Sequence, residues 1–123
     1  MTTPNLSPKL SIEELKKRAC ETIDKRKKEI IDLAKQVLAN PEAGFREFKT
    51  AQLVAQKFQE LGIQHQGGLA VTGLKGKIPG GAGSGPTVAV IGELDSLVVT
   101  EHPHADPVTG AAHACGHHCQ IGM

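Results

Sequence analysis

Apolar residues recur every three to four positions in two stretches of the first half of the chain. This spacing predicts helices that bury one face. Ser11 and Glu14 fit a capping box, in which two side chains satisfy free N–H groups at a helix start. Asn40-Pro41 ends this first helix, since the residue before a proline is pushed out of the α region. A second helix is expected over about residues 47–61, with Gly62 at its end.

The second half of the chain has the pattern of strands. Residues 71–78 partly alternate between apolar and polar, which predicts a half-exposed strand. Residues 87–92 (Thr-Val-Ala-Val-Ile-Gly) are nearly all apolar, which predicts a central strand buried on both faces. Residues 79–86 predict a loop, and they lack the Gly-Lys-Ser/Thr ending of a phosphate-binding loop. We therefore expect an α/β fold, with two N-terminal helices followed by strands of a central mixed sheet.

Length and charge narrow the class of protein. The chain has 123 residues, enough for one small domain or part of a larger one, and we divide it into a polar tail (1–10) and a domain (11–123). A net charge of +1 and only three aromatic residues argue against nucleic-acid binding. No apolar run could span a membrane, and the polar start is not a secretory signal. Three cysteines suggest a reducing compartment, so we expect a cytoplasmic protein.

Two carboxylates follow the expected central strand. Glu93 and Asp95 are separated by one residue, so in an extended segment both side chains point to the same side. Open α/β sheets hold their ligands at this end of the strands, which makes the two residues candidates for a site. The alternative is a solvated loop edge or a helix cap.

Metal-binding side chains gather near the end of the chain. Five of the six histidines lie between positions 102 and 118, and two of the three cysteines are Cys115 and Cys119. A thiolate and an imidazole at Cys115 and His117, with Gly116 between them, could reach one metal ion from a tight loop. Three interpretations stay open. The first is a closed structural zinc site built from Cys115, His117 or His118, and Cys119. The second is a catalytic site to which some of these residues contribute, with its other ligands elsewhere. The third is that none of them binds metal.

Three motifs in this order resemble the dimetal amidohydrolase and aminoacylase family of metallopeptidases. Residues 40–62 resemble the family's opening pattern, N-P-E-x-G-F-x-E followed by T-A and L-G. Residues 92–97 fall where the family carries A-D-M-D-A-L, and residues 113–117 match its H-A-C-G-H letter for letter. The resemblance covers roughly residues 26–123.

The resemblance implies the first part of a zinc-peptidase-like catalytic domain, whose complete site holds two divalent ions, Zn or Mn. Cys115 and His117 would be metal ligands. Asp95 would be the catalytic-site acid that supports those ligands. Glu93 falls where other branches have a ligand or a nearby acid, and we group it with the metal ligands.

Substrate and completeness also follow from the resemblance. The usual motif continues C-G-H-D-G-H, whereas this chain has His118, Cys119 and Gln120, which inclines it to the aminobenzoyl-glutamate hydrolase-like branch. The family hydrolyses an amide bond in an N-acyl amino acid, an aminobenzoyl-glutamate-like compound or a dipeptide. Its members are several times longer, so we expect an N-terminal fragment that is inactive alone. The alternatives are a small metal-binding protein or a non-catalytic module that self-associates into homo-oligomers.

Overall fold

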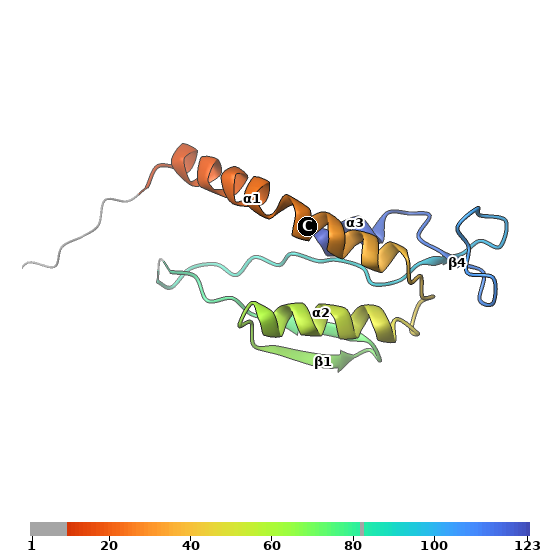
Figure 1. Ribbon diagram of the computed structural model, residues 1–123. Coiled ribbons are helices and arrows are strands. Elements are labelled where there is room, and N and C mark those ends of the chain that lie inside the picture. The colour runs from red at the N-terminus through yellow and green to blue at the C-terminus, as the bar shows by residue number, and fades with distance from the viewer. Residues whose placement is uncertain (1–9, 82) are drawn as a thin grey trace, which may run out of the picture.

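The computed structural model describes residues 10–81 and 83–123, so the expected polar tail lies outside the described residues except for Leu10. Along the described part of the chain, α1 and α2 come first, the short strands β1 to β4 follow, and the short helix α3 comes last (Figure 1). The elements are α1 (Ile12–Leu38), α2 (Phe48–Glu60), β1 (His65–Leu69), β2 (Gly73–Gly76), β3 (Leu97–Val98), β4 (Ala111–Ala112) and α3 (His117–Gly122).

Helix α1 begins and ends where the sequence predicts. The Ser11 hydroxyl accepts a hydrogen bond of 3.1 Å from the Glu14 backbone N–H, and the helix stops two residues before Asn40. Most of its surface faces solvent, including the charged residues 24–29. Val37, near its end, is only 1% exposed and is the largest fully buried side chain in the described part of the chain. Packing is therefore concentrated in the last turns of α1.

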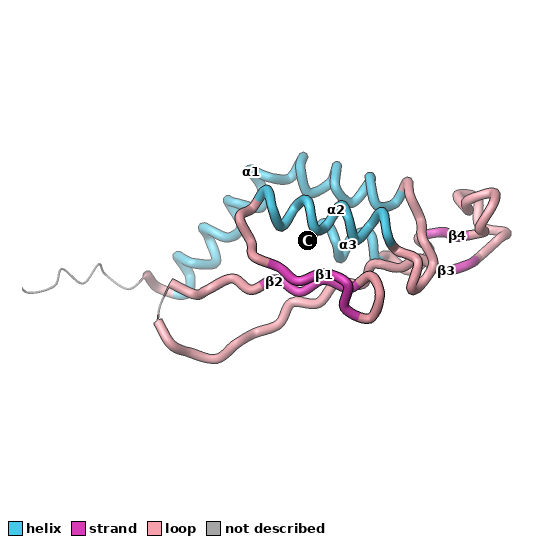
Figure 2. The backbone as a smooth tube through the Cα atoms, turned by 90° about the horizontal axis from the view of Figure 1, so that it is seen from below, coloured by secondary structure: helices cyan, strands magenta, loops and turns pink. Residues whose placement is uncertain are grey.

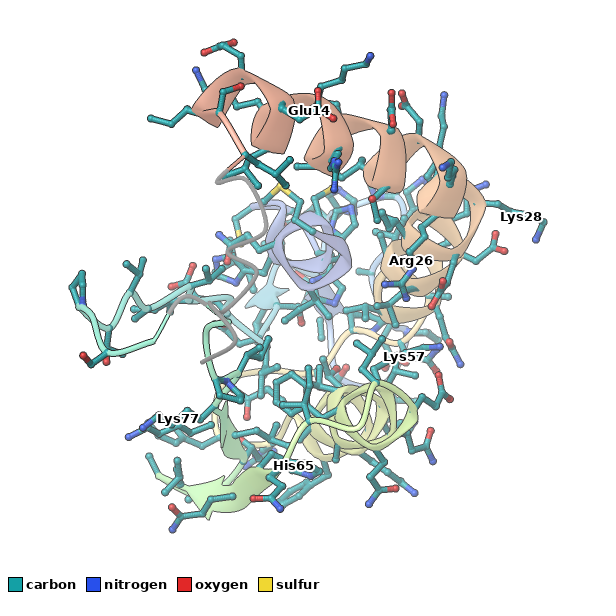
Figure 3. The ribbon with its side chains drawn as sticks, turned by 90° about the vertical axis from the view of Figure 1, so that its left-hand side faces the viewer. Glu14, Arg26, Lys28, Lys57, His65 and Lys77 are labelled. Carbon is teal, nitrogen blue, oxygen red and sulfur yellow. The ribbon has the colours of Figure 1, made fainter. Side chains whose placement is uncertain are left out.

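Helix α2 also confirms its prediction, and Gly62 follows it with the left-handed φ of +67° that glycine favours. At the other end, the N–H groups of the first turn of α2 are capped by a carboxylate from outside the helix. The Glu42 side chain accepts the backbone N–H of Lys49 at 3.1 Å and that of Thr50 at 2.9 Å. The salt bridge from Lys57 to Glu29, at 3.9 Å, joins α2 to α1. Figure 3 shows Arg26 and Lys57 on the side where these two helices approach each other.

A hairpin of β1 and β2 packs against α2. The strand expected over 71–78 is shortened to β2, because Val71 turns back with a φ of +84°. Its partner β1 was not predicted, since its sequence, His-Gln-Gly-Gly-Leu, lacks the β-branched residues typical of strands. The Phe58 ring lies 5.3 Å from the His65 ring, which joins helix and hairpin.

The prediction of a buried central strand at residues 87–92 is wrong. This segment pairs with no strand in the described part of the chain, and Figure 2 shows it as a loop. Val88 is 83% exposed and Val90 is 99% exposed. A strand needs a neighbour on at least one edge, and in the described residues β1 and β2 pair only with each other, as do β3 and β4, so residues 87–92 have no strand partner. Two small antiparallel sheets replace the central mixed sheet, and the chain keeps a mixed α/β character.

The second sheet joins β3 to β4 at the side of the molecule where α1 ends and α2 begins (Figure 2). Ala111 and Ala112 of β4 are fully buried. Just before β3, Ser96 donates from its backbone N–H and from its hydroxyl to the Glu42 carbonyl, at 2.8 and 2.9 Å. Ser96 is thereby fixed to the connection between α1 and α2.

The short helix α3 lies against α1 (Figure 1). A Cβ atom at Gly122 would lie 3.0 Å from the Cβ of Ala34 and 3.2 Å from the Ile30 carbonyl, so the two backbones approach closely. A Cβ atom at Gly92 would lie 3.3 Å from the side chain of Ile121, so α3 also contacts the segment before Glu93. Neither α1 nor any other helix in the described ranges has the length and apolarity that a membrane crossing requires.

Candidate active site

His117 lies between the two carboxylates that the sequence singled out. Its Nε2 atom is 2.9 Å from Oε2 of Glu93, and its Nδ1 atom is 2.9 Å from Oδ1 of Asp95. The His117 side chain is 15% exposed, whereas those of Asp95 and Glu93 are 34% and 58% exposed. The structure thus brings together three of the four predicted site residues.

Local structure explains this arrangement. Gly116, just before α3, has a φ of +92°, which glycine adopts readily and other residues rarely do. The next residue, His117, then begins α3 with its ring toward the 93–95 segment. Asp95 precedes the fixed Ser96, and its backbone carbonyl also lies 2.9 Å from Nδ1 of His117. The ring can donate to both carboxylates only when both nitrogens are protonated, and to one carboxylate when it is neutral.

Cys115 is exposed on the loop before α3. In the described ranges, no three His, Cys, Asp or Glu side chains are arranged to hold one metal ion. The donor types still fit: thiolate, imidazole and carboxylate all bind zinc, and two ligands of one zinc lie about 3.4 Å apart. His117 and Glu93, at 2.9 Å, would separate slightly to admit an ion. The described residues thus provide suitable donors that do not form a complete site.

A second group of side chains lies at the same end of the chain. His113 is 7% exposed, and its ring lies 5.4 Å from that of His118. Both ring nitrogens of His113 and Nδ1 of His118 are buried without a hydrogen-bond partner in the described residues. Burial lowers the pKa of His113, and the charges of His118 and His117 lower it further. Sγ of Cys119 lies 3.3 Å from Nε2 of His118, but the closed zinc site considered from the sequence is not formed by the described residues.

Sequence reasoning missed the contribution of Gln120. Its Oε1 atom accepts the Glu93 backbone N–H at 2.9 Å, and its Nε2 atom donates to Oε2 of Glu93 at 3.3 Å. The available signal was the spacing of three residues from His117, which places both side chains on one face of a helix.

Known proteins match most of this chain. It is 36% identical over 98 residues to thermostable carboxypeptidase 2 of Saccharolobus solfataricus, which covers 76% of this chain and 25% of the relative. It is 32% identical over 97 residues to IAA-amino acid hydrolase ILR1-like 4 of Arabidopsis thaliana, covering 76% of this chain and 22% of the relative. It is 35% identical over 85 residues to hippurate hydrolase of Campylobacter jejuni, covering 67% of this chain and 22% of the relative.

No family model and no solved structure matches the chain. The chain spans about a quarter of the length of the curated relatives it matches. Its sequence relates it, over that span, to the family of amidohydrolases and carboxypeptidases.

Proposed function

We propose that this chain supplies part of the active site of a metal-dependent enzyme that hydrolyses an amide bond. The observation that carries the proposal is the position of His117 between Glu93 and Asp95. The matched relatives are named as hydrolases of IAA-amino acid and of hippurate and as a carboxypeptidase, which supports a small amide or peptide substrate. An N-acyl amino acid, an aminobenzoyl-glutamate-like compound and a dipeptide are the substrates we propose.

Each residue has a distinct role in this proposal. Cys115, His117 and Glu93 would hold a divalent ion, with Zn favoured over Mn because thiolate and imidazole are softer ligands than carboxylate. Such an ion lowers the pKa of bound water and polarises a carbonyl oxygen. Asp95 accepts a hydrogen bond from the Nδ1–H group of His117, which would fix the ring and leave its Nε2 atom free to bind the ion. Glu93 already lies on the Nε2 side of the ring.

The remaining groups come from sequence outside these 123 residues. A hydrolase of this kind needs a general base and further ligands, and catalytic zinc usually has three protein ligands and an open position. The relatives are about four times longer than the matched span, which leaves room for those groups. We therefore propose that the chain alone is inactive, and that the complete enzyme works in the cytoplasm, where free thiols such as those of Cys20, Cys115 and Cys119 persist.

A chimera tests this function. The matched segment of thermostable carboxypeptidase 2 is replaced by the corresponding residues of this chain, and peptide hydrolysis and bound metal are measured. The chimera is expected to bind metal and hydrolyse peptide, whereas His117→Ala removes both. His104→Ala is the matched control, because His104 is exposed and its ring lies beside that of His102 rather than beside His117. A folded chimera that binds no metal, or activity that survives His117→Ala, would contradict the proposal.

A self-associating module is the second candidate, favoured by the uncovered residues 87–92. Unpaired strands with exposed apolar side chains tend to pair with another chain. Val88 and Ile91 are both 83% exposed, and the segment carries no charge to prevent pairing. Light scattering of the 123-residue chain with and without chelator tests this candidate: oligomers that persist in chelator support it, and a monomer at all concentrations excludes it.

A further inference from the structure

Glu93 has little structure of its own to hold it. It follows residues 87–92, which pair with no strand in the described ranges, and its side chain is 58% exposed. A glutamate in such a segment samples several rotamers, and ordering its long side chain costs conformational entropy. Its contact with Nε2 of His117 therefore requires a restraint from another residue.

Gln120 supplies that restraint with both ends of one amide group. Oε1 of Gln120 accepts the Glu93 backbone N–H at 2.9 Å, which fixes the chain at this residue. Nε2 of Gln120 donates to Oε2 of Glu93 at 3.3 Å, which fixes the carboxylate. The same Oε2 atom lies 2.9 Å from Nε2 of His117. One carboxylate oxygen is thus held by two side chains of α3.

The geometry points to Gln120 as the positioning residue of the site: we infer that it orients Glu93 for binding the divalent ion, an inference that rests on the proposed function. A glutamine suits this task because its amide both donates and accepts and adds no charge beside the carboxylate. A glutamate could not donate when ionised, and its charge would repel Glu93. Hydrogen bonds that orient a metal ligand typically account for 10–100-fold in metal affinity.

The anchoring of α3 makes the restraint effective. α3 packs closely on α1 at Gly122, and Ile121 contacts the segment at Gly92. Gln120 therefore projects from a helix that is itself held in place. Its hydrogen bonds to Glu93 restrain a segment that has no strand partner in the described ranges.

Gln120→Met tests the inference, because methionine keeps the length of the side chain and removes both hydrogen bonds. Gln52→Met is the matched control, since Gln52 is exposed on α2. NMR of the metal-free chain is expected to show faster exchange of the Glu93 amide and a shifted Glu93 carboxyl carbon in Gln120→Met alone. Calorimetric titration with Zn²⁺ is expected to show about 10–100-fold weaker binding for the same variant. The NMR measurement is made on the 123-residue chain, and the titration on the chimera described above, in which the remaining ligands are supplied.

Two results would overturn the inference. One is a Glu93 amide and carboxyl carbon that do not change in Gln120→Met. The other is an unchanged zinc affinity despite a released Glu93, which would leave Gln120 a purely structural role. A chimera that binds no zinc, combined with the expected change at Glu93 in the chain, would count against the proposed function, while the NMR result would still establish that Gln120 positions Glu93.

Discussion

The hydroxyl of Thr72 donates a hydrogen bond of 2.6 Å to the carboxylate of Glu47, 25 positions earlier in the chain. Both residues are buried, at 8% and 7% exposure. The same carboxylate accepts the Phe45 backbone N–H at 2.9 Å. A buried carboxylate requires such donors, because an unpaired buried charge is costly. This pair therefore fastens the turn of the β1–β2 hairpin to the start of α2.

Replacing Thr72 by valine is expected to destabilise the fold. The shape of the side chain is kept, but Glu47 loses a donor and stays buried. The free energy of unfolding, measured with urea, should fall by about 1–3 kcal/mol. Thr22→Val, on the exposed face of α1, should change it by no more than about 0.5 kcal/mol. Equal effects of the two substitutions would mean that the Thr72–Glu47 bond contributes nothing specific.

Glu42→Ala is expected to weaken α2 without displacing the candidate site. The substitution removes the acceptor for the backbone N–H groups of Lys49 and Thr50. The expected cost is that of losing a helix N-cap, about 1 kcal/mol in the free energy of unfolding. The Glu42 carbonyl still holds Ser96, so the contacts of Asp95 should persist in NMR spectra. Glu60→Ala at the other end of α2 is the control, since it loses only an exposed ion pair with Lys57. If Glu60→Ala lowers the free energy of unfolding as much as Glu42→Ala does, Glu42 does not act as a cap of α2.

Gly110→Ala is expected to lower stability for two separable reasons. Gly110 has a φ of +70°, which strains any residue with a Cβ atom, and that atom would lie 2.7 Å from Cγ2 of Thr100. We expect a loss of about 1–3 kcal/mol in thermal or urea unfolding. Adding Thr100→Ser removes the colliding methyl group and should recover part of the loss. Gly80→Ala is the control, because its Cβ atom would meet open space; no recovery in the double variant would mean that strain alone is responsible.

Asp106 is expected to make the 102–110 loop sensitive to acid. Hydrogen bonds from the Thr109 backbone, the Thr109 hydroxyl and the Val108 backbone hold the pKa of Asp106 below its ordinary value of 3.8. Since the folded-state pKa is lowered, the stabilisation is fully present above the ordinary pKa of 3.8. It is lost as the pH falls from there through the folded-state pKa. The melting temperatures of wild type and Asp106→Asn should therefore differ at neutral pH and converge in acid. A difference that stays constant through the acid range would show that ionisation of Asp106 is not involved.

Local signals in the sequence predicted the helices well. The Ser11 cap, the stop at Asn40-Pro41 and the left-handed Gly62 each act through neighbouring backbone, so they need no knowledge of the rest of the fold. The prediction of a buried strand at residues 87–92 failed for the opposite reason. A run of apolar β-branched residues shows only that a segment can form a buried strand, and burial depends on neighbours that the segment does not encode.

The candidate site was predictable in part. The alternation of Glu93 and Asp95 indicated that both would face one side, and the H-A-C-G-H motif indicated His117, although their roles stay predictions. Gln120 was missed because glutamine carries no chemistry of its own that marks a site. Its importance comes from its position one helical turn after His117 and opposite Glu93, which only the folded backbone shows.

Helix α1 has 27 residues and so extends for about 40 Å, but its burial is confined to the end near Val37. Its first half is stabilised by exposed ion pairs, among them Glu14 with Arg18, which contribute only about 0.3–0.5 kcal/mol each. A helical segment with so little packing sits near its own helix–coil midpoint, because propagation is only weakly favourable in water. One continuous helix thus contains two thermodynamic units: a terminal segment that melts gradually and is weakened by salt, and a segment beside α3 that melts only with the fold.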